Sequence, residues 1–187
     1  MSLDPALRAR IESVLSANPV VLFLKGTPEA PQCGFSAKTA AAMDATGATY
    51  AHVNVLADPE IRDGIKLYGD WPTIPQLYIH GELVGGCDIV TQMAASGELH
   101  AALGLPAPDR TPPQITITDA AAEMLKQALA NAGEGYALQI EVDQGFNARL
   151  QLAPVDSAAI ATEAAGIRAQ FDLVSAQRAR GLTIDWA

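Results

Sequence analysis

Apolar and polar positions follow two alternating periods over the first hundred residues. Apolar residues spaced three and four apart predict amphipathic helices at 3–17, 34–46, 59–68 and 88–103. Apolar runs between turn residues predict strands at 20–24, 49–55, 77–79 and 82–84. This order, with a parallel pair followed by a hairpin, predicts an α/β domain in which helices flank a central mixed four-stranded sheet.

The residues after 113 show shorter runs with strand spacing. The predicted strands lie at 114–118, 136–142, 148–152, 167–171 and 182–186. Asp119 is expected to cap a helix over about 120–131, and a helical turn is expected at 173–180. These elements predict a small α+β domain that is mostly antiparallel.

A proline-rich segment separates the two parts. Residues 105–113 contain four prolines, which neither a helix nor an inner strand tolerates. We therefore predict a domain at 1–105, a semi-rigid linker at 106–113 and a second domain at 114–187.

Composition narrows the classes of function. Hydrophobic residues make up 49% of the 187 residues, which is enough for a buried core. The net charge of −9 is dispersed without a basic stripe, so neither nucleic acid nor a membrane surface is an expected partner. No apolar run approaches the roughly 20 residues of a membrane span. Two cysteines and the lack of a signal-peptide pattern in the first residues lead us to expect a cytoplasmic location.

The motif Cys33-Gly-Phe-Ser36 begins a predicted helix directly after a breaker-rich loop. Unpaired helix N–H groups and the helix dipole stabilise a thiolate at such a position, and Lys25 adds a positive charge. Serine at position 36 removes the second thiol of a C-x-x-C site, so Cys33 cannot resolve a mixed disulfide or saturate a metal cluster alone. Both redox and metal chemistry therefore demand an external thiol. The alternative is a buried cysteine that only caps the helix.

Two further motifs offer backbone groups to a ligand. Pro75, in Trp71-Pro-Thr-Ile-Pro75, either adopts the cis form and exposes a strand edge or simply forms a rigid turn. In Gly85-Gly-Cys-Asp88, the glycines permit close approach of a ligand, and Asp88 either pairs with an ammonium group or caps a helix. Cys87 is interpreted as structural. The histidines at 52, 80 and 100 show no ligand spacing.

Together with Lys25, these motifs closely resemble the monothiol glutaredoxins over about residues 3–104. The resemblance implies a thioredoxin-like fold with Pro75 in cis and a glutathione groove. Lys25 and Arg62 would hold the glycine carboxylate, the backbone of Thr73 and Ile74 the cysteinyl part, and Cys87 and Asp88 the γ-glutamyl end. The predicted cofactor-binding residues are Lys25, Cys33, Phe35, Arg62, Thr73, Ile74, Pro75, Gly86, Cys87 and Asp88.

The family resemblance also implies a function. A homodimer would share one [2Fe–2S] cluster, ligated in each subunit by Cys33 and one glutathione thiolate. Such a protein stores or transfers clusters to apo iron–sulfur proteins and pairs with BolA-like proteins. The long spacer between Lys25 and Cys33 is associated with weak thiol-transferase activity, so the chain is expected to be at most a weak enzyme. The alternative function is glutathione-dependent deglutathionylation through Cys33.

The second domain resembles the A-type, HesB/IscA-like iron–sulfur carriers. Residues 115–120 and 181–186 carry this resemblance. Gly145-Phe146 occupies the loop where the first ligand cysteine of such a carrier would lie, and the terminal cysteine pair is missing as well. We therefore expect a degenerate carrier domain that ligates no cluster through thiolates of its own.

Overall fold

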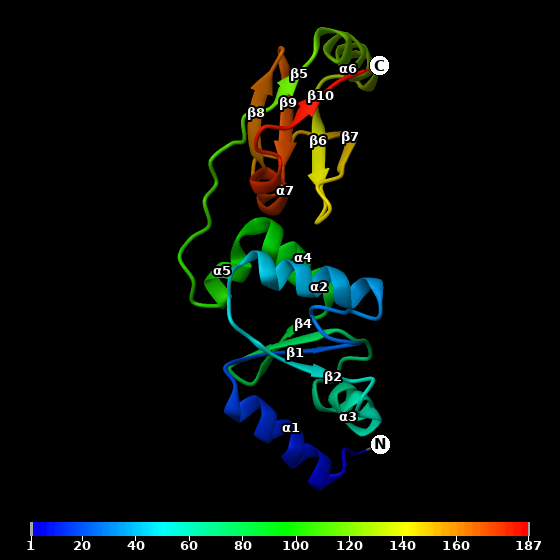
Figure 1. Cartoon of the computed structure of the whole chain (residues 1–187), viewed down its shortest axis with the longest axis vertical. Helices are drawn as coiled ribbons and strands as arrows, with labels where there is room; N and C mark the ends of the chain where they lie inside the picture. Colours follow the sequence, from blue (N-terminus) through cyan, green and yellow to red (C-terminus); the bar gives the residue numbers. More distant parts are fainter. Residues whose placement is uncertain (1, 187) are drawn as a thin grey trace. The chain divides into compact units, whose positions relative to one another are not determined.

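The computed structural model describes residues 2–186 (Figure 1). The chain divides into two compact units, Met1–Ala107 and Pro108–Ala187, and the division falls inside the proline-rich segment. Each unit has its own four-stranded sheet and its own buried apolar residues.

A four-stranded sheet of order β2-β1-β3-β4 forms the centre of the first unit. Its strands are β1 (Val20–Leu24), β2 (Ala51–Asn54), β3 (Gln76–Ile79) and β4 (Glu82–Gly85). Strand β1 pairs in parallel with β2 and antiparallel with β3, and β3 pairs antiparallel with β4. All five residues of β1 are buried, as its continuous apolar sequence predicts. The thioredoxin-like fold class is confirmed.

Helices cover both faces of this sheet (Figure 1). They are α1 (Pro5–Ala17), α2 (Gly34–Ala45), α3 (Pro59–Tyr68), α4 (Cys87–Ser96) and α5 (Glu98–Ala102). Alternate residues of β1 point to opposite faces, so Leu22 and Leu24 pack in the core beneath α2 and α4. Val21 and Phe23 pack in the other core, against α1 and α3.

The helix boundaries follow local capping chemistry. Asp4 and Asp58 cap α1 and α3, and each aspartate precedes a proline at the first helical position. The single helix predicted at 88–103 is wrong, because Gly97 has a φ of 87° and separates α4 from α5.

The second unit contains a four-stranded sheet of order β7-β6-β9-β8 and a two-stranded sheet. The larger sheet consists of β6 (Tyr136–Val142), β7 (Ala148–Pro154), β8 (Ile160–Ala164) and β9 (Ile167–Phe171). The smaller sheet pairs β5 (Thr116–Ile117) with β10 (Thr183–Ile184). Residues from the strands, from α6 (Asp119–Ala132) and from α7 (Leu173–Arg178) form one core.

Two details of this unit differ from the sequence-based expectation. Strand β8 was not predicted, because Ile160 is its only large apolar residue; pairing with β9 across the turn at Ala165 and Gly166 holds it in the sheet. Thr118, not Asp119, caps α6 by accepting a hydrogen bond from the Ala121 N–H. The sheet-rich character of the unit is as expected, although β6–β9 and β5–β10 are parallel pairs.

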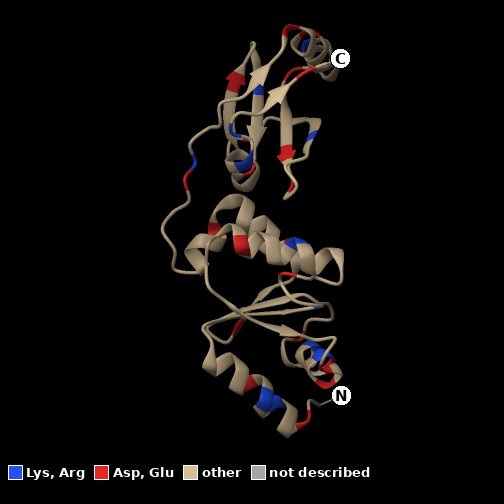
Figure 2. Cartoon of the chain, in the orientation of Figure 1, with Lys and Arg blue, Asp and Glu red and all other residues tan. Residues whose placement is uncertain are grey.

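Charged side chains of both signs are interspersed along each unit (Figure 2). Among residues 2–186, no helix combines the length and the apolar character needed to cross a bilayer.

Candidate functional site: a cysteine at a helix N-terminus beside a groove

Cys33 is the N-cap residue of α2, directly after the loop that follows β1. Its backbone is extended and its sulfur accepts a hydrogen bond from the Ser36 N–H at 3.3 Å. The Ser36 Oγ lies 3.2 Å from the same sulfur. The side chain is half-buried, so the sulfur sits among helix donors and remains accessible.

Ser36 connects this cysteine to the central sheet. Its side chain is fully buried, and its Oγ accepts a hydrogen bond of 3.0 Å from the Lys25 N–H. The hydroxyl hydrogen is therefore free to point to the Cys33 sulfur. From the sequence, Ser36 stands out only as the replacement of a second thiol.

The pKa of the Cys33 thiol is lowered. Partial burial raises the pKa, but hydrogen bonds from Ser36 and from the Phe35 N–H, together with the positive charge of Lys25, outweigh that effect. The arrangement therefore favours the thiolate, which is the nucleophilic and metal-ligating form.

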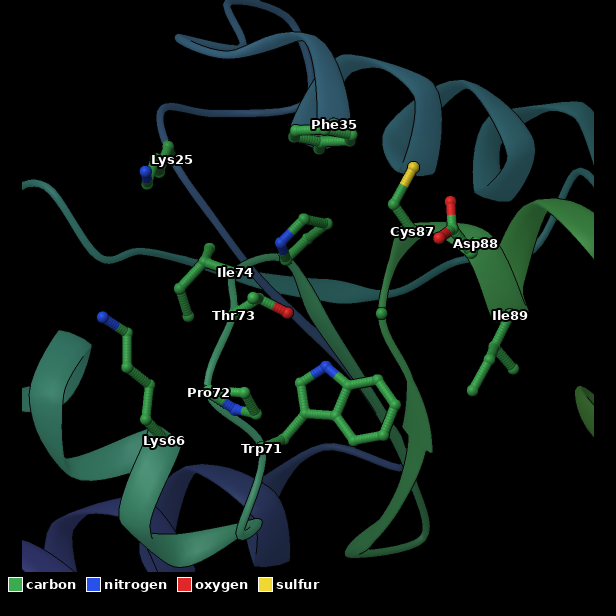
Figure 3. A pocket seen from close by; sticks show the side chains of 12 residues that line it. Lys25, Phe35, Lys66, Trp71, Pro72, Thr73, Ile74, Cys87, Asp88 and Ile89 are labelled. Carbon is green, nitrogen blue, oxygen red and sulfur yellow. The ribbon is translucent and has the colours of Figure 1, made fainter.

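A groove of about 600 Å³ lies next to this helix N-terminus (Figure 3). Eight predicted residues line it: Lys25, Phe35, Thr73, Ile74, Pro75, Gly86, Cys87 and Asp88. Four lining residues were not among the predicted site residues: Lys66, Trp71, Pro72 and Ile89. Cys33 and Arg62 are not lining residues, although Cys33 is two residues from Phe35 in α2.

The two ends of the groove differ in charge. Figure 3 shows Lys25 and Lys66 on one side and Asp88, next to Cys87, on the other. Such a groove suits an elongated ligand with a carboxylate at one end and an ammonium group at the other. Arg62 is exposed one turn before Lys66, and its Nε lies 3.4 Å from Asp63. The role predicted for Arg62 stays a prediction.

The loop of residues 71–75 is held from beneath by Gln76. This side chain is fully buried, and its Nε2 donates to the carbonyl oxygens of Trp71 and Thr73 at 2.9 and 3.2 Å. The Tyr78 hydroxyl donates to its Oε1 at 3.0 Å. The Ile74–Pro75 bond is cis, as the family resemblance implies.

The opposite wall begins at the N-terminus of α4. Gly86 is the N-cap residue, so Asp88 is not the cap, and its exposed carboxylate is free for a ligand. A Cβ on Gly86 would lie 3.1 Å from the Trp71 Nε1 and 3.3 Å from the Pro75 carbonyl oxygen. Glycine thus permits the two walls of the groove to approach each other. Within residues 2–186, the buried Trp71 Nε1 has no hydrogen-bond partner.

The described residues contain no group of three or more His, Cys, Asp and Glu side chains that could hold a metal ion. Any metal cluster at Cys33 therefore needs ligands from outside this chain.

The first unit combines a thioredoxin-like sheet, a cysteine at the N-terminus of α2 and a cis proline that lines the adjacent groove, and the Glutaredoxin family model matches residues 20–84. The chain is 53% identical over 102 residues to monothiol glutaredoxin-5, mitochondrial, of Saccharomyces cerevisiae, which covers 53% of this chain and 68% of that protein. It is 54% identical over 89 residues to probable monothiol glutaredoxin 2 of Rickettsia felis, which covers 48% of this chain and 86% of the relative. The chain belongs to the monothiol glutaredoxin family.

Among solved structures, reduced poplar apo GrxS14 is 44% identical, with a TM-score of 0.49 over 56% of this chain and 95% of that chain. A buckwheat glutaredoxin–glutathione complex is 25% identical, with a TM-score of 0.46 over 53% of this chain and 87% of that chain.

The yeast relative contradicts the cytoplasmic location expected from the sequence, because its name is that of a mitochondrial protein. The expectation depended on cysteine usage, which distinguishes reducing from oxidising compartments but does not separate one reducing compartment from another. On this finding, the prediction of a cytoplasmic location is wrong.

Proposed function

We propose that this protein is an iron–sulfur carrier in which two copies share one [2Fe–2S] cluster through their Cys33 thiolates and two glutathione thiolates. The observation that carries the proposal is the single thiol of Cys33 at the N-terminus of α2, where its pKa is lowered, with Ser36 in place of a resolving cysteine. One thiolate from each of two chains leaves two of the four ligand positions to an external thiol.

The groove beside Cys33 supports glutathione as that thiol. The ammonium groups of Lys25 and Lys66 would hold its glycine carboxylate, and Arg62 would add charge from one turn away. Asp88 would pair with the γ-glutamyl ammonium group. The backbone of Thr73 and Ile74, fixed by Gln76, would pair with the cysteinyl residue as a short strand.

Anaerobic reconstitution with iron, sulfide and glutathione tests the proposal. The visible spectrum and the size-exclusion profile are followed together. We expect a coloured dimer that loses its absorption bands when glutathione is removed. A protein that stays colourless, or that keeps a full cluster without glutathione, would contradict the proposal.

Cys33→Ser is the informative variant, and Cys87→Ser makes the same change at the other half-buried cysteine, which lines the groove but keeps its backbone there. We expect Cys33→Ser to bind no cluster while its circular dichroism is unchanged. We expect Cys87→Ser to retain the cluster.

The low pKa of Cys33 also favours a second function, deglutathionylation. The thiolate would attack the glutathione sulfur of a protein mixed disulfide, forming Cys33–S–S–glutathione and releasing the protein thiolate. A second glutathione thiolate would then release Cys33 and leave oxidised glutathione. Steady-state turnover well above the glutathione background would support this function, and turnover at that background would count against it.

For the second unit, we propose the fold of an A-type carrier without its cysteines, used to contact proteins that receive or deliver clusters. Apo iron–sulfur proteins and a BolA-like protein are the proposed partners of the whole chain. Truncation after Ala107, at the boundary between the compact units, tests this role. Unchanged cluster transfer by the truncated protein would remove the support for it.

A further inference from the structure

The second unit presents an open sheet edge. Strand β7 is the terminal strand of its sheet, and its residues 148–151 are exposed. Exposed edge strands are usually short or protected by charged side chains, because their unpaired backbone groups bind other strands. This strand spans seven residues, carries a single charge, on Arg149, and has its one proline, Pro154, at its last position.

The backbone hydrogen bonds identify which groups of β7 are free. Val155 N–H donates to the Gly135 carbonyl oxygen at one end, and Asp143 N–H donates to the Asn147 carbonyl oxygen at the other. Antiparallel pairing alternates with a period of two, so residues 149, 151 and 153 bond to β6. Residues 148, 150 and 152 therefore point their own N–H and carbonyl groups away from β6. No strand within residues 2–186 pairs with these groups.

Exposed apolar side chains accompany this edge. Phe146, at the tip of the β6–β7 loop, is 70% exposed and has a φ of 61°. The loop is held by hydrogen bonds from Asn147 N–H to the Asp143 carboxylate at 2.9 Å and from Phe146 N–H to the Asp143 carbonyl oxygen at 3.1 Å. Leu150 and Val155 are 40% and 43% exposed. An aromatic residue fixed on a short loop loses little entropy on binding and is a typical anchor of a protein interface.

We propose that β7 pairs antiparallel with β7 of a second copy of this chain, with Gln151 of both copies on the two-fold axis. Leu150 then lies opposite Leu152 of the second copy, and Ala148 lies opposite its Pro154. Leu150 and Leu152 of the two copies exchange about four backbone hydrogen bonds. The Ala148–Pro154 ends add none, because Pro154 has no N–H and its carbonyl oxygen already accepts from Gln170. Each Phe146 extends past the end of the pairing, beside Val155 of the other copy.

The strand is complementary to itself in this register. Leu150 and Leu152 lie on the face of the sheet that carries the core residues Leu138 and Ile140, so the apolar layer continues into the second copy. Arg149 lies opposite Ala153, and no like charges face each other across the pairing. A two-fold interface requires such self-complementarity, because the same surface of each copy forms both sides of the contact.

The other edge of the same sheet does not offer an equivalent surface. Strand β8 has five residues, most of them buried or half-buried, and it carries Glu163. Arg110 donates a hydrogen bond to the carbonyl oxygen of Ala158, two residues before β8 begins. Of the two edges, β7 offers the longer and more exposed strand.

This dimer does not depend on the proposed cluster function. It forms without iron or glutathione, whereas a dimer held by a shared cluster disappears when glutathione is removed. A preformed dimer would also place two Cys33 thiols in one particle and raise their effective concentration for a shared cluster.

Light scattering during size exclusion of the full chain tests the proposal, in buffer with a phosphine reductant and without iron and glutathione. We expect a dimer at high protein concentration that dissociates on dilution. Gln151→Lys places two lysines opposite each other on the axis, and we expect dimerisation to weaken on the order of tenfold. Gln151→Glu is expected to weaken it as well, and it also meets Glu141, which Gln151 contacts within each chain at 3.4 Å. An equimolar mixture of the two variants pairs opposite charges and should form the dimer again.

Gln127→Lys is the matched control, since Gln127 is exposed on α6 and undergoes the same change of charge. We expect it to dimerise as the unmodified protein does. A monomeric unmodified protein at all concentrations, a Gln151→Lys dimer of unchanged strength, or a mixture that stays monomeric would each overturn the proposal.

Discussion

In each unit a junction joins the N-terminus of a helix to the end of a strand through a buried serine, with a different residue at the helix cap. In the first unit Cys33 caps α2, and Ser36 accepts a hydrogen bond from the N–H that follows β1. In the second unit Asp172 caps α7, and Ser175 accepts a hydrogen bond of 3.0 Å from the Val142 N–H at the end of β6. Both serines are buried, and both lie three residues after the cap.

The difference between the two caps shows what Cys33 contributes. A carboxylate is a strong acceptor for helix N–H groups, whereas a thiol sulfur is a weak one. Asp172 accepts the Ser175 N–H at 2.7 Å, so this junction needs no cysteine for its stability. Cys33 is therefore better explained by the reactivity of its thiolate than by the stability of α2. The first unit adds a groove beside the cap, lined by Phe35.

Cys33→Asp places the cap residue of α7 at the start of α2 and has the largest expected effect. Because aspartate is the better cap, we expect α2 to persist and the free energy of unfolding to stay equal or rise by up to about 1 kcal/mol. We expect the cluster to be lost completely, because one thiolate in each chain is gone. Urea unfolding and anaerobic reconstitution measure the two effects. A variant that fails to fold would show that the two junctions are not equivalent.

Two buried glutamines sharpen the comparison. Gln76 holds the 71–75 loop of the groove, and Gln170 donates to the Pro154 carbonyl oxygen while its Oε1 accepts from the Asp156 N–H. Replacing either by alanine leaves buried polar groups unpaired, so we expect a loss of about 2–3 kcal/mol in the free energy of unfolding. Only Gln76→Ala should also weaken glutathione binding, which a titration followed by NMR measures. Equal glutathione affinity in both variants would contradict the role assigned to Gln76.

Much of the fold of the first unit follows from local sequence. The apolar run of β1, the Asp-Pro starts of α1 and α3 and the His80-Gly81 turn each specify an element without help from distant residues. Strand β8 does not, because its place depends on pairing with β9. The apolar and polar pattern of residues 160–164 alone therefore does not predict this strand.

The sequence predicted most of the residues that line the groove, but not all of them. The family motifs identified Lys25 and Asp88, which lie at its two ends. Lys66 was not identified because its place depends on the turn after α3, where the Trp71 N–H donates to the Lys66 carbonyl oxygen at 2.9 Å. This bond holds the end of α3 against the loop that forms the groove, and the spacing of charges along the helix does not show it.

The matched variants Ser36→Ala and Ser175→Ala separate stability from reactivity. Each leaves one buried N–H without an acceptor, so we expect both to lower the free energy of unfolding by about 1–2 kcal/mol. Only Ser36→Ala should raise the pKa of Cys33, because it removes a hydrogen bond to the thiolate. The pH dependence of alkylation by iodoacetamide measures this pKa.

The sign of the pH dependence follows from the lowered pKa of Cys33. The folded state favours the thiolate, so this group contributes stability that is fully present above the pKa of the unfolded thiol. That contribution is lost as the pH falls through the lower pKa of the folded state. Ser36→Ala should reduce this dependence and Ser175→Ala should leave it unchanged; an equal change in both variants would exclude the proposed link between Ser36 and Cys33.

Lys66→Gln and Arg62→Gln give the smallest expected effects. They test whether the glycine carboxylate of glutathione binds at Lys66, which lines the groove, or at Arg62, which the family resemblance implies. Lys66 lines the groove, so its loss should weaken glutathione binding about threefold to tenfold, and less at high salt. Arg62 is exposed beside Asp63, and its loss should weaken binding less than about twofold. Titrations at low and moderate salt, with exposed Lys38→Gln as the control for net charge, measure both effects. If Arg62→Gln has the larger effect, the glycine carboxylate binds where the resemblance places it, and Lys66 only borders the site.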